Sequence, residues 1–157
     1  MRQDIYYCKS WFRAKKKPTE VWSVEQAQAA HANREQYTAL VGSIERPYCF
    51  IEVADTAVVV GFLDDALRES LTYVFKEVEQ GRLFLSMATH REFEAETDKV
   101  SGGANYVFKT DGVVHIRHEF FNPHRVETAT SPFDPAPNYS PRPEFGEYND
   151  LIRVERT

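Results

Sequence analysis

Residues 47–63 read PYCFIEVADTAVVVGFL, and this stretch decides the fold class of the chain. Two apolar runs, residues 47–54 and 56–63, meet near Ala54 and Asp55 and lack the 3.6-residue spacing of a helix. β-branched and aromatic residues fit a pleated surface, and so short a connection joins antiparallel neighbours. The stretch therefore predicts a β-hairpin.

The same pattern continues downstream as four further strands in two pairs, at residues 71–78, 82–93, 105–109 and 113–121. The first pair turns at Gln80 and Gly81, and the second at the turn signal that Asp111 opens. Residues 64–70 are predicted to connect two hairpins, and residues 101–104 to form a Gly-rich loop. Together with the first hairpin, this predicts six successive antiparallel strands.

Upstream of the hairpin, the sequence predicts one strand and one helix. Residues 4–13 mix aromatic and polar side chains without helical spacing, which favours an amphipathic strand. Ser23 and Gln26 form a capping box, and Gly42 is a typical helix stop, so a helix is expected over residues 24–41. Arg34 would lie along the edge of that helix, with its stem packed and its head in water.

The composition changes after residue 121, because six of the eight prolines fall between Pro123 and Pro143. Proline removes a backbone donor, so regular structure is not expected there, apart from a short closing strand at residues 151–154. Aromatic residues are nevertheless spaced through this tail, at Phe133, Tyr139, Phe145 and Tyr148. We expect the tail to lie extended over one face of the sheet; the alternative is that it orders only on a partner.

These elements predict an α+β fold, with one N-terminal helix packed on a curved or partly barrel-like antiparallel meander of six or more strands. The predicted domain spans residues 1–121, and residues 122–157 form the Pro-rich segment packed on it. The chain has 157 residues, of which 42% are hydrophobic, enough for one globular core without disulfides or metals.

Charge and cysteine usage narrow the function classes. A formal charge of -5 argues against binding to nucleic acid, which requires a basic surface. Cys8 and Cys49 lack CxxC spacing and a nearby ligand cluster, so we expect buried thiols, no metal and no cofactor. The first ten residues lack the apolar region of a signal peptide, and no stretch is long enough to span a bilayer, so the prediction is a cytoplasmic protein that does not associate with membranes. The basic run at residues 13–17 is interpreted as a solvated loop.

The most specific chemical pattern is a ladder of carboxylates in the segment LFLSMATHREFEAETD, residues 83–98. If the strand continued through it, Glu92, Glu94, Glu96 and Asp98 would share one face at roughly 7 Å spacing and would require a basic partner or water as screen. Asp64 and Asp65 are predicted to join this surface, and Tyr139 and Tyr148 to anchor it, because aromatic residues carry much interface energy. The alternative interpretation of the ladder is a solvated strand end.

The layout of the chain resembles the small cytoplasmic immunity proteins that protect bacteria from polymorphic toxins. The likeness covers roughly residues 4–121: a first strand, a capped helix beginning WSVEQ, and a meander from YCFIEVADTAVVVGF to YVFKTDGVVHIRHEFF. No family motif is matched residue by residue. The resemblance implies a non-enzymatic protein-binding module that occludes the active site of one cognate toxin with a basic surface.

Two other interpretations stay open at this point. A ligand-binding or catalytic β-barrel would gather His90, His115 and Glu119 around a small molecule. His115 and His118 are three residues apart on one strand, so they would point to opposite faces and not chelate one metal. A scaffold subunit would instead use exposed strand edges for oligomerisation; the sequence does not determine the oligomeric state.

Overall fold

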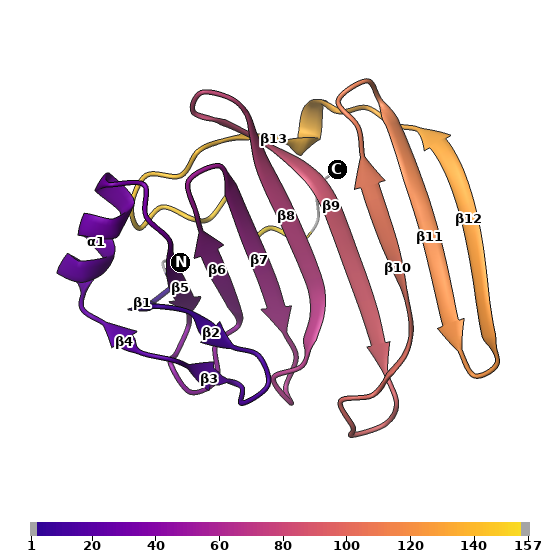
Figure 1. Cartoon of the computed structure of the whole chain (residues 1–157), viewed down its shortest axis with the longest axis horizontal. Helices are drawn as coiled ribbons and strands as arrows, with labels where there is room; N and C mark the ends of the chain where they lie inside the picture. The colour runs from indigo at the N-terminus through magenta and orange to yellow at the C-terminus, as the bar shows by residue number, and fades with distance from the viewer. Residues whose placement is uncertain (1–2, 155–157) are drawn as a thin grey trace.

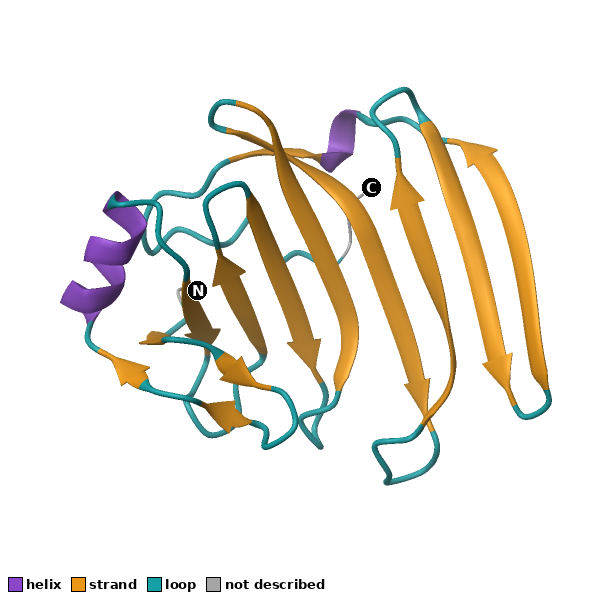
Figure 2. Ribbon diagram, in the orientation of Figure 1, coloured by secondary structure: helices purple, strands orange, loops and turns teal. Residues whose placement is uncertain are grey.

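The computed structural model describes residues 3–154, which contain one α-helix and a large, curved antiparallel sheet (Figures 1 and 2). The α+β class is therefore as predicted. The elements are β1 (Ile5–Cys8), β2 (Trp11–Phe12), β3 (Lys17–Pro18), β4 (Val21–Trp22), α1 (Val24–Ala32), β5 (Tyr37–Val41), β6 (Cys49–Val53), β7 (Ala57–Leu63), β8 (Glu69–Glu79), β9 (Arg82–Phe93), β10 (Val100–Phe108), β11 (Val113–Phe121), β12 (His124–Pro132), a 3-10 turn η1 (Ala136–Asn138) and β13 (Tyr139–Pro141). No helix in residues 3–154 is long and apolar enough to cross a membrane.

The sheet contains eleven strands in the described range, with the order β12-β11-β10-β9-β8-β7-β6-β5-β1-β4 and with β13 paired to β9. From β5 to β12 each strand lies beside the next one in the sequence, so the predicted meander is confirmed and is longer than six strands. The hairpin of β6 and β7 turns at Ala54, whose N–H donates to the carbonyl of Ala57. The sheet is open, with β12 at one end and β4 at the other (Figure 1).

The predicted helix over residues 24–41 is wrong in its second half. The capping box of Ser23 and Gln26 is present, but α1 ends at Ala32. Arg34 adopts a left-handed backbone (φ 56°) and pairs with Asp55 and Glu77 instead of lying along a helix. Residues 37–41 form β5, which is buried throughout between β1 and β6. A strand with neighbours on both sides buries these side chains more completely than a surface helix would.

The predicted strand over residues 4–13 divides in two. β1 pairs with β5 in the large sheet, whereas β2 pairs with β3 in a separate two-stranded ribbon. Trp11 on β2 is buried and stacks on Phe50 with ring centroids 6.2 Å apart. The ribbon therefore covers the face of the sheet that carries Phe50.

The predicted Gly-rich loop at residues 101–104 is wrong, because this segment lies inside β10. A Cβ atom on Gly103 would lie 2.3 Å from the carbonyl oxygen of His90, and one on Gly102 would lie 2.9 Å from that of Glu119. Glycine in a strand interior often marks such close approach of neighbouring backbones. These two residues therefore serve strand packing rather than a turn.

Regular structure also occurs after residue 121, contrary to the prediction. β12 begins just after Pro123 and ends at Pro132, so its ladder with β11 needs no donor from an interior proline. The expected closing strand at residues 151–154 is absent, because that segment forms turns and bends. β13 pairs with the start of β9, and the chain then passes behind the sheet in the view of Figure 1.

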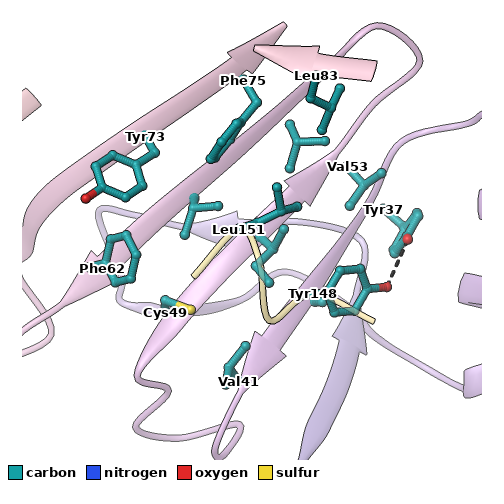
Figure 3. Packing of buried hydrophobic residues seen from close by; sticks show 14 of the residues in the cluster. Tyr37, Val41, Cys49, Val53, Phe62, Tyr73, Phe75, Leu83, Tyr148 and Leu151 are labelled. Atoms are coloured by element: carbon teal, nitrogen blue, oxygen red, sulfur yellow. Dashed lines mark hydrogen bonds between the residues drawn. The ribbon is translucent and has the colours of Figure 1, made fainter. Parts of the chain in front are cut away.

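The main core lies between one face of the sheet and this last segment. Leu151, 1% exposed, and Tyr148, 2% exposed, enter a cluster of sheet residues that includes Val53, Phe62 and Phe75 (Figure 3). The Tyr148 hydroxyl lies 2.9 Å from that of Tyr37 on β5. The tail thus supplies the second layer that a sheet needs to bury an apolar face.

Candidate functional site

A cavity of about 440 Å³ lies on the face of the sheet opposite the tail, between the β2–β3 ribbon, the loop of residues 64–68 and the loop of residues 94–99. We call it the loop-rimmed cavity. Its apolar walls are Trp11, Leu63, Leu67 and Phe93. A volume of this size and walls of this kind fall in the range of ordinary binding pockets.

The floor of the cavity is a polar network on β8 and β9. Glu69 accepts from Nε of Arg13 at 3.0 Å and from the Thr72 hydroxyl. That hydroxyl accepts in turn from NH1 of Arg91 at 2.9 Å, and the Arg91 guanidinium lies 3.9 Å from Glu69. A second carboxylate, Glu52, pairs with Arg13 at 2.5 Å. Burial opposes the charge on Arg13, but Glu52 and Glu69 outweigh it and raise the pKa of its guanidinium.

Two basic side chains connect the loops around the cavity. Nζ of Lys16 donates to the carbonyl of Ala66 at 3.0 Å and to Asp98 at 2.8 Å. Arg68 pairs with Asp64 at 2.8 Å, and its NH1 donates to two carbonyls of the 94–99 loop at 2.8 and 2.9 Å. Burial raises the pKa of Asp64, but hydrogen bonds from the Arg68 and Ala66 backbone and the Arg68 side chain outweigh it and lower the pKa overall.

Each of the three segments around the cavity contains a non-glycine residue in the left-handed backbone region: Lys16 (φ 55°), Leu67 (φ 58°) and Ala95 (φ 42°). Such conformations cost free energy and persist where the surrounding contacts hold them. The hydrogen bonds of Lys16 and Arg68 described above supply contacts of this kind. Strained backbone of this sort clusters at ligand clamps and binding sites, which marks the loop-rimmed cavity as the candidate site.

The structure corrects the carboxylate ladder. β9 ends at Phe93, and the N–H of Thr97 donates to the carbonyl of Glu94, so the segment turns and the four acids do not share one strand face. Glu94 pairs with Lys99 at 3.3 Å, whereas Asp98 pairs with Lys16. The ladder fails because the turn of the 94–99 loop interrupts the strand that would have carried it.

Asp64 and Asp65 lie on a loop next to the one that carries most of the acids of the predicted ladder. Arg68 and Lys16 connect the 64–68 loop to the 94–99 loop, so all of these acids except Glu92 lie on two joined loops. Glu92 is exposed at the end of β9, beside the second loop. Asp65 and Glu96 are also exposed.

The two tyrosines predicted as anchors lie elsewhere. Tyr148 is buried in the core, so its prediction as an interface anchor is wrong: its hydroxyl cluster with Tyr37 fixes the tail instead. Tyr139 packs on Phe84, with Arg82 stacked 3.9 Å from the ring centroid. It pairs with Phe84 near the start of β9, eight residues or roughly 26 Å along the strand from Glu92.

The alternative constellation of His90, His115 and Glu119 does not converge. In the strand register His90 lies opposite Ala104, whereas Glu119 lies opposite Gly103, so the two side chains project from opposite faces. His115 and Glu119 share a face. Glu119 accepts from the ring of His124 at 2.8 Å, and His115 lies 3.3 Å from the Thr130 hydroxyl.

A second cavity of about 380 Å³ adjoins the first, because Arg91 lines both. Gly103 lies in its floor, with Asn105 and Arg117 beside it and Glu119 across the strand pair. The missing side chain of Gly103 leaves room between Arg91 and Glu119. The two cavities therefore lie side by side on the polar face, with Arg91 between them.

Sequence reasoning missed the polar floor of the loop-rimmed cavity. Arg13 was assigned to a solvated basic run, and Glu69 and Thr72 to a connector and a plain strand. Alternation places Thr72 on the face opposite Leu71 and Tyr73, but it places Glu69 on the Leu71 side, and the register shift beside Glu69 is not visible in the sequence. Only the tertiary arrangement shows that Arg91 and Arg13 meet them.

No group of three or more metal-ligating side chains suited to an ion occurs within residues 3–154. Comparison of the chain with protein-family models, curated proteins and solved structures found no match. The geometry and charge of the loop-rimmed cavity are thus the basis on which a function is inferred.

Proposed function

We propose that this chain is a non-enzymatic protein-binding module of the immunity type, which neutralises a bacterial toxin in the cytoplasm by covering its active site. The partner surface would be the acidic rim of the loop-rimmed cavity, formed by Asp65, Glu94 and Glu96 on the two loops; Glu92 lies beside them at the end of β9, on the opposite face of the strand from Arg91 and Phe93. The cognate toxin would present a basic cleft to this rim.

The observation that carries the proposal is the convergence of two acidic loops on one cavity. Segment 92–99 carries four carboxylates and one lysine, and the 64–68 loop adds Asp64 and Asp65 against Arg68. Asp64 and Asp98 are already paired within the chain, whereas Asp65 and Glu96 are exposed. Exposed charges of one sign speed encounter with an opposite surface and suppress wrong partners.

The cavity between the loops supports the same function by offering an anchor position. Trp11, Leu67 and Phe93 provide an apolar wall, whereas Glu69 on the floor is already paired with Arg13 and Arg91. An apolar or aromatic side chain of the partner matches this wall. Binding energy in interfaces is concentrated in such pocketed anchors, with the rim charges affecting mainly the association rate.

The test is affinity capture from the native cytoplasm with the chain and two triple variants of equal charge change. Asp65→Lys, Glu94→Lys and Glu96→Lys together reverse the rim. Asp4→Lys, Glu35→Lys and Glu144→Lys together reverse three exposed acids outside the rim.

We expect one stoichiometric partner with the unaltered chain and with the control, and its loss or slower association with the rim variant. Expression of the captured protein alone should then arrest growth, whereas expression together with the unaltered chain should not. Equal capture by both variants would remove the rim from the interface. A small molecule retained through purification, with no protein partner, would assign the cavity to a ligand instead.

A further inference from the structure

The outer strand of the sheet, β12, is a long free edge. It has nine residues and pairs on one side with β11; within residues 3–154 no strand lies on its other side (Figure 1). Eight of its nine residues are exposed. A row of unpaired backbone N–H and C=O groups on such an edge is a template for another strand.

The opposite end of the sheet does not offer a comparable edge. It is closed by β4, which has two residues and leads directly into α1. Because the described sheet has a single long edge, pairing between two copies would use the same strand twice and would close as a two-fold dimer rather than extend as a fibre.

Charge disfavours two registers of such a pair, although Arg125 and Glu127 also pair within one chain at 3.4 Å. Arg125 and Glu127 lie two residues apart on one face of β12, with Val126 between them on the other. If Val126 lies on the two-fold axis, Arg125 of each copy lies opposite Glu127 of the other. Moving the axis by one residue to Glu127 or Arg125 instead sets like charges directly opposite each other, which is unfavourable.

Exposed apolar side chains gather at the same end of the hairpin. Phe120 is 38% exposed, Phe121 44% and Val126 38%. The Arg125 guanidinium lies 4.5 Å from the Phe120 ring centroid, so the charged and apolar parts of this end are already in contact. A two-fold axis at Val126 brings the two Val126 side chains together, with Phe121 on the same face and Phe120 on the opposite face beside Arg125.

We infer that two copies of this chain associate through antiparallel pairing of β12, with Val126 on the two-fold axis and two reciprocal pairs between Arg125 and Glu127. Five residues of each strand, 124–128, take part. A single strand pair is a small interface, so the association is weak and depends on concentration. This inference is independent of the proposed function, because β12 lies three strands, or about 14 Å, from β9 and its acidic loop.

The first test is sedimentation equilibrium over a range of concentrations with a charge swap. Arg125→Glu and Glu127→Arg each set like charges opposite each other, and each should raise the dimer dissociation constant about tenfold or more. The double variant Arg125→Glu with Glu127→Arg restores opposite charges and should restore association. A matched circular dichroism spectrum for all four proteins shows that the fold is kept.

The second test fixes the register with introduced cysteines, since Cys8 and Cys49 are buried and free. Val126→Cys should form a disulfide between copies under mild oxidation, because directly opposed residues have Cα atoms about 4.5–5.5 Å apart. Thr128→Cys is the matched control, since its two copies would lie four residues apart, about 13 Å.

Each outcome decides the inference. Cross-linking through position 126 alone, with charge-swap rescue, supports it. A monomer at every concentration, or cross-linking through position 128 instead of 126, overturns it, as does a dimer that the charge reversals leave unchanged. Loss of toxin binding in the rim variant with intact dimerisation would show that the two proposals stand separately.

Discussion

Replacing Leu151 by alanine should destabilise the whole protein, because this side chain joins the tail to the core. It is 1% exposed and lies in the main cluster with residues from β5 to β9 (Figure 3). Large-to-small changes of a buried leucine cost 2–5 kcal/mol, so we expect a loss of about 3 kcal/mol. For a chain of 157 residues this corresponds to a fall in Tm of about 6–12 °C.

The assay is urea and thermal unfolding followed by circular dichroism, with Asn149→Ala as the matched control in the same segment. Asn149 is exposed, so its replacement should change the free energy of unfolding by less than about 0.5 kcal/mol. If the tail ordered only on a partner, Leu151→Ala would be as silent as the control. That result would refute the reasoning that the tail forms the second layer of the core.

Three further predictions concern single groups. In urea unfolding, Gly103→Ala should lower the free energy of unfolding by about 1–3 kcal/mol, because its Cβ would collide with a carbonyl oxygen of β9. The control Gly81→Ala has open space around the new Cβ and should lower the free energy of unfolding by less, chiefly through the positive φ of that position. Burial and, to a smaller extent, the neighbouring Arg142 and Arg34 lower the pKa of His31. The free energy of unfolding should therefore fall as the pH drops below about 6.5, and it should level off below the pKa of His31 in the folded protein. In a plot of Tm against pH, His31→Gln should flatten this slope. Burial raises the pKa of both Cys8 and Cys49 to about 12, so a thiol reagent should label neither in the native state and both in denaturant; rapid native labelling would contradict their burial.

The sequence predicted the fold best where local pattern and tertiary context agree. The hairpin of residues 47–63 alternates β-branched and aromatic side chains, and both of its strands lie inside the sheet, where such residues pack well. Residues 37–41 show the converse case. They continue a helical pattern after Ala32, yet they lie between β1 and β6, and pairing with two strands decides their structure.

The acidic loops beside the candidate site were predicted in composition, but neither their geometry nor the lining of the cavity was. The acids of the two loops were recognised because charge is visible in the sequence. Their arrangement was not, because the turn at Glu94 depends on a hydrogen bond from its N–H to the carbonyl of Lys99. The floor was invisible for a related reason: Arg13 reaches Glu69 across 56 residues, and no local pattern encodes that contact.

The path of the tail explains why the two proposed binding surfaces are the acidic loops and the outer strand β12. Its contacts begin where Phe133 packs on Phe108 of β10 and continue across β9 to Tyr7 of β1, which Phe145 stacks on. This covers the apolar face from β1 to β10, so those strands gain hydrophobic stabilisation. The tail does not cover β11 and β12, and β12 is exposed along nearly its whole length. Strands that bury little in the monomer keep their side chains and outer backbone groups available for another chain, and the acidic loops lie on the face that the tail does not cross.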